Sequence, residues 1–156
     1  GGTAVVAPVG HSLIKEKMLQ EDAIFGGESS GHYFYKLPFG TFEAPIMLVL
    51  KFLAYATQHP KLSELVQPHK RYFNSGEINT SLTSREAGLE LLKKLQETYA
   101  DGTHYLLDGL TVEYPDYWFN VRLSNTGGAT MRFILESRNI ELMEQKRDEV
   151  LKIIRS

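Results

Sequence analysis

The second half of the chain carries the cap and turn signals that most restrict how this sequence can fold. Thr83 and Glu86 form a capping box, a hydroxyl followed three residues later by a carboxylate, and they predict a helix directly behind them. Asp108-Gly109 separates two apolar runs and favours a tight hairpin turn. Asn139 can cap a second helix. The expected order of elements is therefore strand, helix, four strands, helix.

The apolar residues of this half indicate which faces are buried. Strands are expected at 78–82, 106–107, 110–112, 119–123 and 131–135. The inward-facing residues expected on the two helices are Leu89, Leu92, Leu95 and Tyr99 on the first, and Ile140, Met143, Val150 and Ile154 on the last. This pattern predicts a two-layer α+β domain with an antiparallel sheet and helices on one face.

The first half is expected to run strand, helix, strand, strand, helix, which is typical of a partial mixed α/β domain. Strands are expected at Ala4–Val6, Ala23–Phe25 and His32–Lys36, and a helix from a cap at Ser12 to about Gln20. Pro45 suits the first turn of a second helix. Because 46–56 is apolar on nearly all sides, this helix is expected to be largely buried.

A polar, proline-containing stretch, Gln67–Arg71, separates the two halves. It predicts one domain over 1–68 and a second over 72–156. The chain also opens with Gly1-Gly2 and enters an apolar run almost at once, which indicates a cut inside a larger protein.

Charge and composition restrict the partners that the chain can have. The formal net charge of −2 gives no electrostatic basis for binding nucleic acid or an anionic membrane. The sequence has no cysteine, which excludes disulfides and thiolate metal sites. With no signal peptide recognisable at its start, a cytoplasmic location is expected.

The stretch "GGESSGH", Gly26–His32, concentrates hydrogen-bonding groups on a glycine-rich bend. Glycines let the backbone approach a ligand closely, and a carboxylate such as Glu28 can accept from two neighbouring hydroxyls of a sugar. The residues alone leave a second interpretation open, a turn whose Ser and Glu side chains satisfy local backbone groups.

The stretch "VRLSNTGG", Val121–Gly128, is a second candidate. Arg122 offers a planar fork suited to phosphate, and successive N–H groups in a glycine-rich turn can bind an anion. An ordinary hairpin turn explains the same residues. His11 stands where a phosphate could meet a helix start, although a surface histidine is the plainer interpretation. His59, His69 and His104 share no metal-ligand spacing.

Taken in order, four stretches resemble the C-terminal part of the α-D-phosphohexomutases, the phosphomannomutase/phosphoglucomutase family. "VGHSLIKEKM" (9–18) is similar to a helix start in the family's domain three, and "FGGESSGHYFY" (25–35) to its sugar-binding loop. "GEIN" (76–79) resembles the entry strand of domain four, and "DGLTVEYPDYWFNVRLSNT" (108–126) the run into that domain's phosphate-binding loop. The resemblance covers nearly the whole chain, from the end of domain three through domain four.

The resemblance implies an isomerase that interconverts hexose 1-phosphate and 6-phosphate, of mannose or glucose, through a bisphosphate intermediate. A phosphoserine in domain one and Mg²⁺ held in domain two would supply the chemistry. The residues that it implies for sugar binding are Glu28, Ser30 and His32, with His11 near the reacting phosphate. Those that it implies for the other phosphate are Arg122, Ser124, Asn125, Thr126, Gly127 and Gly128.

The same resemblance implies that the catalytic serine and the metal loop lie in N-terminal domains outside this chain. The chain alone is therefore expected to bind hexose phosphate weakly, to hold no metal and to catalyse nothing. Two alternatives remain on the sequence: a stand-alone sugar-phosphate-binding module without catalysis, and a purely structural α+β domain.

Overall fold

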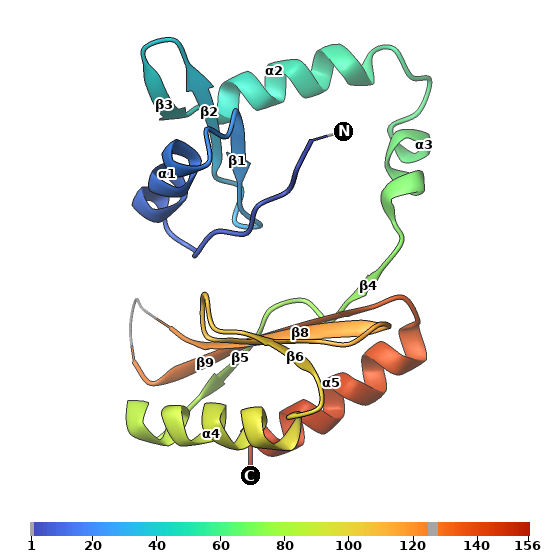
Figure 1. Cartoon of the computed structure of the whole chain (residues 1–156). Helices are drawn as coiled ribbons and strands as arrows, with labels where there is room; N and C mark the ends of the chain where they lie inside the picture. The colour runs from blue at the N-terminus through green and yellow to red at the C-terminus, as the bar shows by residue number, and fades with distance from the viewer. Residues whose placement is uncertain (1, 125–127) are drawn as a thin grey trace. The chain divides into compact units, whose positions relative to one another are not determined.

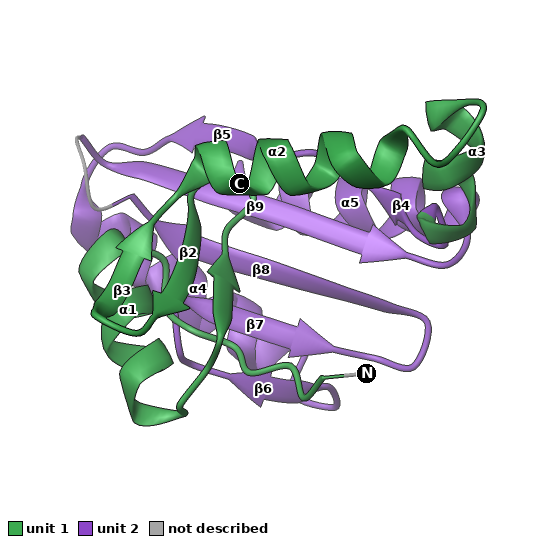
Figure 2. Cartoon of the chain, turned by 90° about the horizontal axis from the view of Figure 1, so that it is seen from above, with its two compact units in different colours: residues 1–69 green, residues 70–156 purple. Residues whose placement is uncertain are grey.

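The computed structural model describes residues 2–124 and 128–156, and the chain divides into two compact units, Gly1–His69 and Lys70–Ser156 (Figure 2). Each unit has its own cluster of buried apolar side chains. Both combine helices with antiparallel sheet (Figure 1), so the expected fold class, α/β followed by α+β, is confirmed.

The first unit places three short strands beside helices. Its elements are α1 (His11–Gln20), β1 (Phe25–Gly27), β2 (Tyr33–Leu37), β3 (Gly40–Glu43), α2 (Pro45–Ala56), α3 (Leu62–Val66) and the 3₁₀ turn η1 (Gln67–His69). The strands form one antiparallel sheet in the order β1-β2-β3.

The core of the first unit is small. Its buried apolar residues are Ile14 and Met18 of α1 and Phe34 of β2. Helix α1 packs so close to β1 that a Cβ on Gly26 would lie 2.7 Å from the sulfur of Met18. Glycine at position 26 therefore lets the strand lie directly on the helix.

Several expected elements of the first unit are corrected by the structure. Ala4–Val6 forms no strand, and Val5 and Val6 are 48% and 77% exposed. A strand needs a partner ladder for its backbone groups, and no described strand pairs with this segment. The strand expected at 23–25 begins only at Phe25, and strand β3 was not expected. Helix α1 starts at His11, with Gly10 at the cap position rather than Ser12.

Helix α2 begins with Pro45, as expected, but the prediction that it is buried is wrong. None of its residues is buried, and Ile46, Leu50 and Leu53 are 75%, 61% and 53% exposed. A helix that is apolar on all sides is expected to be packed against other elements on several of them. Among the described elements its main neighbour is β2, which leaves most of the helix surface bare.

The second unit is a six-stranded antiparallel sheet with two helices. Its elements are β4 (Phe73–Asn74), β5 (Ile78–Ser81), α4 (Arg85–Thr98), β6 (Thr103–Tyr105), β7 (Leu110–Glu113), β8 (Tyr117–Leu123), β9 (Thr130–Ser137) and α5 (Ile140–Ile154). The strand order is β4-β9-β8-β7-β6, and β5 also pairs with β9. Helices α4 and α5 lie on the same face of this sheet (Figure 1), as the sequence predicted.

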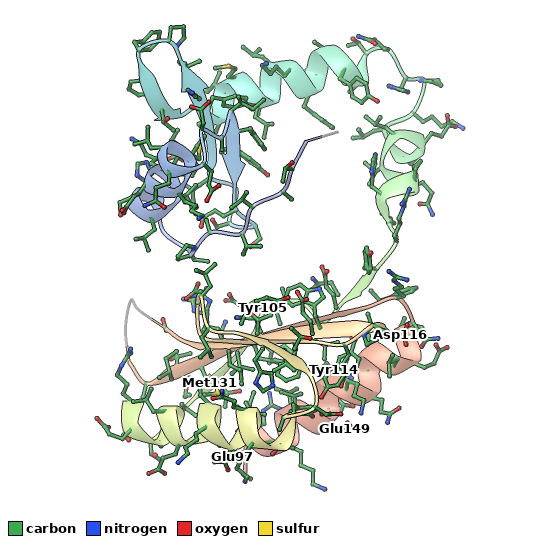
Figure 3. The ribbon with its side chains drawn as sticks, viewed as in Figure 1. Glu97, Tyr105, Tyr114, Asp116, Met131 and Glu149 are labelled. Atoms are coloured by element: carbon green, nitrogen blue, oxygen red, sulfur yellow. The ribbon has the colours of Figure 1, made fainter. Side chains whose placement is uncertain are left out.

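Alternation along the long strands divides the second unit into a core face and an open face. In β8, Phe119, Val121 and Leu123 are buried, while the residues between them are only partly buried. Met131 of β9 lies in the core between the sheet and the helices (Figure 3). Side chains at even-numbered positions of β8 and β9 therefore lie on the face away from the helices.

The caps and the helix faces of the second unit match the expectations in part. Asn139 caps α5, because its Oδ1 accepts from the Leu142 N–H at 2.8 Å. Helix α4 is capped by Ser84 instead of Thr83: the Ser84 hydroxyl accepts from the Ala87 N–H at 3.1 Å. This places the helix one residue later than expected.

Three further expectations for the second unit are wrong. Leu89 and Ile140 are 55% and 42% exposed. Leu89 lies at the margin of the buried face of α4, and Ile140 is the first residue of α5. Leu91 of α4 packs against the core, and Leu151 of α5 lies inside it. Strand β6 lies at 103–105, so the apolar residues 106–107 belong to the turn between β6 and β7.

Candidate functional site

The "GGESSGH" stretch forms the tight turn between β1 and β2. The Glu28 N–H donates to the His32 carbonyl at 3.1 Å, and the Gly31 N–H donates to the Glu28 carbonyl at 3.0 Å. Gly31 has φ +91°, which a residue with a side chain adopts rarely. Ser30 is exposed at the tip, whereas the Glu28 side chain is only 14% exposed.

Two of the expected residues, His11 and His32, meet at one carboxylate, that of Glu43 at the end of β3. Its Oε1 lies 2.7 Å from Nδ1 of His32, and its Oε2 lies 3.3 Å from Nε2 of His11. Nε2 of His32 in turn lies 3.8 Å from Oε1 of Glu28. We call His11, Glu28, His32 and Glu43 the histidine cluster.

The electrostatics of the histidine cluster favour positive charge on His32. Its hydrogen bond with the Glu43 carboxylate and the charge of that group raise the pKa of His32, and the Glu28 charge adds to the effect. The His11 ring packs edge-on against Phe34 at a centroid distance of 5.0 Å. The apolar core of the first unit therefore fixes one side of the cluster.

Arg122 lies on the open face of the second unit, where β8 and β9 place it directly opposite Arg132. Glu77, which precedes β5, bridges the pair: its Oε1 lies 3.1 Å from Nη1 of Arg132, and its Oε2 lies 3.6 Å from Nη2 of Arg122. We call these three residues the arginine cluster. The buried Nε of Arg132 has no hydrogen-bond partner among the described residues.

The turn between β6 and β7 supports Arg122 from the side. Gly109 has φ +73°, and a Cβ there would lie 2.4 Å from the Val121 carbonyl and 2.6 Å from Cβ of Arg122. The Asn120 amide donates to the Asp108 carbonyl at 2.8 Å and to the Thr111 hydroxyl at 2.9 Å. This turn therefore packs tightly against the strand that carries Arg122.

The remaining residues expected to bind phosphate follow β8. Ser124 is buried, its N–H donates to the Thr130 carbonyl at 2.8 Å, and its carbonyl accepts from Nη1 of Arg85 at 3.4 Å. Gly128 has φ +59° and is exposed. Asn125, Thr126 and Gly127 lie outside the described residues.

Sequence reasoning missed Glu43, Arg85 and Arg132, and it gave Glu77 no role. The position of Arg132 could have been predicted from the sequence. In two antiparallel strands joined by one segment, residues equally far from its centre lie opposite each other, and Arg122 and Arg132 are equally far from the centre of 124–130. Glu43 carried no such signal, since strand β3 itself was not expected.

Two kinds of feature are absent from the described residues. Over 2–124 and 128–156, no group of three His, Asp or Glu residues is arranged to hold a metal ion. In the same part of the chain, no helix has both the length and the apolar character needed to cross a bilayer.

Comparison with known proteins gives consistent matches. The family model of phosphoglucomutase/phosphomannomutase, alpha/beta/alpha domain III, matches residues 1–72. The phosphomannomutase of Methanocaldococcus jannaschii is 34% identical over 155 residues, which cover 99% of this chain and 33% of that protein. The phosphomannomutase/phosphoglucomutase of Pseudomonas aeruginosa is 36% identical over 129 residues, covering 81% of this chain and 28% of that protein.

A solved structure agrees with these matches. The crystal structure of a phosphoglucomutase/phosphomannomutase family protein from Burkholderia thailandensis superposes with a TM-score of 0.75 at 26% identity. The match covers 94% of this chain and 31% of that one. The chain thus spans about a third of the length of the proteins that it matches.

Proposed function

The chain belongs to the phosphoglucomutase/phosphomannomutase family, and from this premise we propose that it forms the C-terminal, substrate-binding part of a phosphohexomutase. Residues 1–68 would be the end of domain three, and residues 72–156 domain four. The bare apolar surface of α2 and the unpaired Val5 and Val6 support the proposal, because further domains of a longer protein would cover them.

The reaction proposed for the longer protein interconverts hexose 1-phosphate and 6-phosphate through a bisphosphate. The phosphoserine and the Mg²⁺ that this chemistry uses would belong to the missing N-terminal domains. Among the described residues of this chain, no group of three His, Asp or Glu side chains is arranged to hold a metal ion. The role left to this chain is to hold the sugar and one phosphate, and alone it would be inactive.

The observation that carries the proposal is the histidine cluster. The β1–β2 turn places His32 against Glu43 and Glu28 beside His32, and helix α1 brings His11 to the Glu43 carboxylate. Glu28 can accept from vicinal sugar hydroxyls, Ser30 at the exposed tip can donate, and His32 can do either. His11, at the start of α1, would lie near the reacting phosphate.

The arginine cluster is the corresponding candidate for the phosphate that does not react. The register of β8 and β9 places two arginines opposite each other, and a guanidinium can bind phosphate bidentately. Ser124 and Gly128 flank them, and Asn125, Thr126 and Gly127 are proposed to complete the loop. A hydroxyl-reading turn combined with a separate phosphate clamp could accept the sugar in both orientations, as a mutase requires.

Titration of the ¹⁵N-labelled chain with glucose 1-phosphate tests the proposal. Amide shifts are expected at millimolar ligand in Glu28–His32 and around Arg122. Arg122→Ala should abolish the phosphate-dependent shifts of the second unit and leave those of the first unit in place. No response in either region would favour a purely structural domain, whereas mutase turnover by the isolated chain would contradict the assignment of catalysis to other domains.

A further inference from the structure

Glu43 lies where three elements of the first unit converge, and neither the motifs nor the family comparison assigns it a role. It is the last residue of β3, it faces the β1–β2 turn through His32, and it faces the start of α1 through His11. Its side chain is 28% exposed, so the contacts are shielded from water more than those of an ordinary surface carboxylate. One carboxylate therefore touches both imidazoles of the cluster.

The hydrogen bond between His32 and Glu43 determines which nitrogen of the His32 ring carries the proton. A carboxylate only accepts hydrogen bonds, so the ring nitrogen that is hydrogen-bonded to it must be an N–H. Glu43 faces Nδ1 of His32 but Nε2 of His11. Neutral His32 therefore carries its proton on Nδ1 and keeps a lone pair on Nε2, which lies 3.8 Å from Oε1 of Glu28, beyond hydrogen-bonding distance. The contact of His11 with the second Glu43 oxygen is an ion-pair contact and fixes the position of that ring, not its tautomer.

We propose that Glu43 is the positioning residue of the histidine cluster: its hydrogen bond fixes the ring orientation and tautomer of His32 so that Nε2 meets the sugar phosphate, and its second oxygen holds the His11 ring beside it. This role rests on the proposed function for the identity of the ligand. Glu43 does not touch the ligand in this scheme. It acts through the two imidazoles, as outer carboxylates do behind ligating histidines.

The groups around His32 agree with this role. Glu43 faces it from β3, and Glu28 faces it from the β1–β2 turn, while α1 contributes His11, which shares the Glu43 carboxylate. Lys15 of α1 lies over the Phe42 ring, at 5.8 Å from its centroid. Both carboxylates favour the protonated imidazole, which is why the pKa of His32 is raised. Neutral His32 can accept from a sugar hydroxyl through Nε2, and protonated His32 can donate there to an anionic oxygen.

Histidine ring spectra of the ¹⁵N-labelled chain test the proposal without any ligand. Two-bond ¹H–¹⁵N correlations above the pKa of His32 should show the Nδ1–H tautomer for His32. In Glu43→Gln the pKa of His32 should fall, and its tautomer should shift toward the ordinary Nε2–H form. Glu43→Asp, which keeps the charge, should restore part of the elevated pKa if the chain is folded.

Two controls separate a positioning role from a general loss of charge or of fold. Glu64→Gln removes an exposed carboxylate of α3 in the same unit, and it should leave both histidines unchanged. The amide shifts of β2 in Glu43→Gln should stay close to those of the unmodified chain, which shows that the sheet is intact. Unaltered His32 tautomer and titration in a folded Glu43→Gln chain would overturn the proposal.

Titration with glucose 1-phosphate then tests whether the positioning role of Glu43 affects ligand binding. Glu43→Gln should weaken the response at Glu28–His32 about tenfold, while the response around Arg122 persists. An unmodified chain with the expected His32 tautomer but no response to glucose 1-phosphate overturns the proposed function and not the role of Glu43 toward the rings. A normal response in Glu43→Gln overturns the link between tautomer and binding.

Discussion

The histidine cluster and the arginine cluster share one design and rest on very different scaffolds. In each, a single carboxylate bridges two nitrogen-bearing side chains, Glu43 between His11 and His32, and Glu77 between Arg122 and Arg132. The first is assembled from element ends and a turn over a core of three buried residues. The second lies on the central strands of a sheet backed by fourteen.

The two clusters are therefore held in place by different kinds of contact. Strand pairing fixes Arg122 opposite Arg132, and the buried side chains between the sheet and the helices hold both strands in place. The histidine cluster has only Phe34 and the α1 residues behind it. We therefore expect the geometry of the histidine cluster to depend on a few contacts, and that of the arginine cluster to tolerate local change.

The largest expected effect comes from removing one buried phenylalanine in each unit. Phe34 and Phe133 are 0% and 1% exposed, so they form a matched pair. Phe133→Ala should lower the free energy of unfolding of the second unit by about 3–5 kcal/mol. Phe34→Ala removes one of the three core residues of the first unit and should abolish its cooperative fold, together with the histidine cluster.

Amide hydrogen exchange measures both outcomes separately, and the fluorescence of Trp118 follows the second unit alone. Each substitution should leave the other unit's protection unchanged. Full protection of the β2 amides from exchange in the Phe34→Ala chain would contradict the expectation that the first unit depends on a few core residues.

A second pair concerns glycines with positive φ. Gly109→Ala combines strain with a clash against the Val121 backbone and Arg122, and should cost the second unit about 1–3 kcal/mol. Gly76, at φ +69°, has nothing within 4 Å of an added Cβ, so Gly76→Ala carries the strain without the clash. Urea unfolding followed by Trp118 fluorescence gives both values. Equal losses would mean that the β6–β7 turn does not need its close approach to Arg122.

A smaller effect is expected from the carboxylate of the arginine cluster. The Glu77 side chain is 42% exposed, so its ion pairs should contribute about 0.2–1 kcal/mol and less at high salt. Glu77→Gln should lower the stability of the second unit slightly at low ionic strength, measured by urea unfolding. It should also strengthen phosphate binding, because the guanidiniums lose a competing acceptor. Weaker phosphate binding in this variant would contradict a clamp formed by the two arginines.

The smallest effect is a pH dependence confined to the first unit. Because the folded pKa of His32 is raised, its contribution to stability is complete below the unfolded value of about 6.5 and is lost as the pH rises through the folded pKa. Glu86 and Glu149 of the second unit have lowered pKa values, so their contribution is lost only in acid. Hydrogen exchange between pH 6 and 8, corrected for intrinsic rates, should show the first unit weakening, and Glu43→Gln should flatten this trend.

Much of the second unit was predictable, because local signals and tertiary packing agree there. Asn139 caps its helix, and Asp108-Gly109 forms its turn. Errors of one residue arose where two hydroxyls, those of Thr83 and Ser84, compete for one cap. Leu89 shows the limit of periodicity, because helical spacing alone does not give the width of the buried stripe.

The first unit was predicted less well for a different reason. The burial expected for α2 and the strand expected at Ala4–Val6 both require neighbouring elements as partners, and apolar composition alone does not say whether such partners are in place. The β1–β2 turn and His11 were identified as candidates from their residue types, but the contacts around Glu43 depend on a strand that gave no periodic signal. Pairings made by ends of elements are set by tertiary structure, and neither propensity nor spacing encodes them.

The exposed apolar surface of α2 is also expected to affect the solubility of this chain. Ile46, Leu50 and Leu53 are exposed apolar residues of one helix with one cation, Lys51, among them, and we expect molecules in solution to associate through them. Sulfate salts strengthen apolar association and should precipitate the chain at moderate concentration, whereas mild detergent should keep it dispersed. We therefore expect helix α2 to limit the solubility of the isolated chain, independently of the chemistry at either cluster.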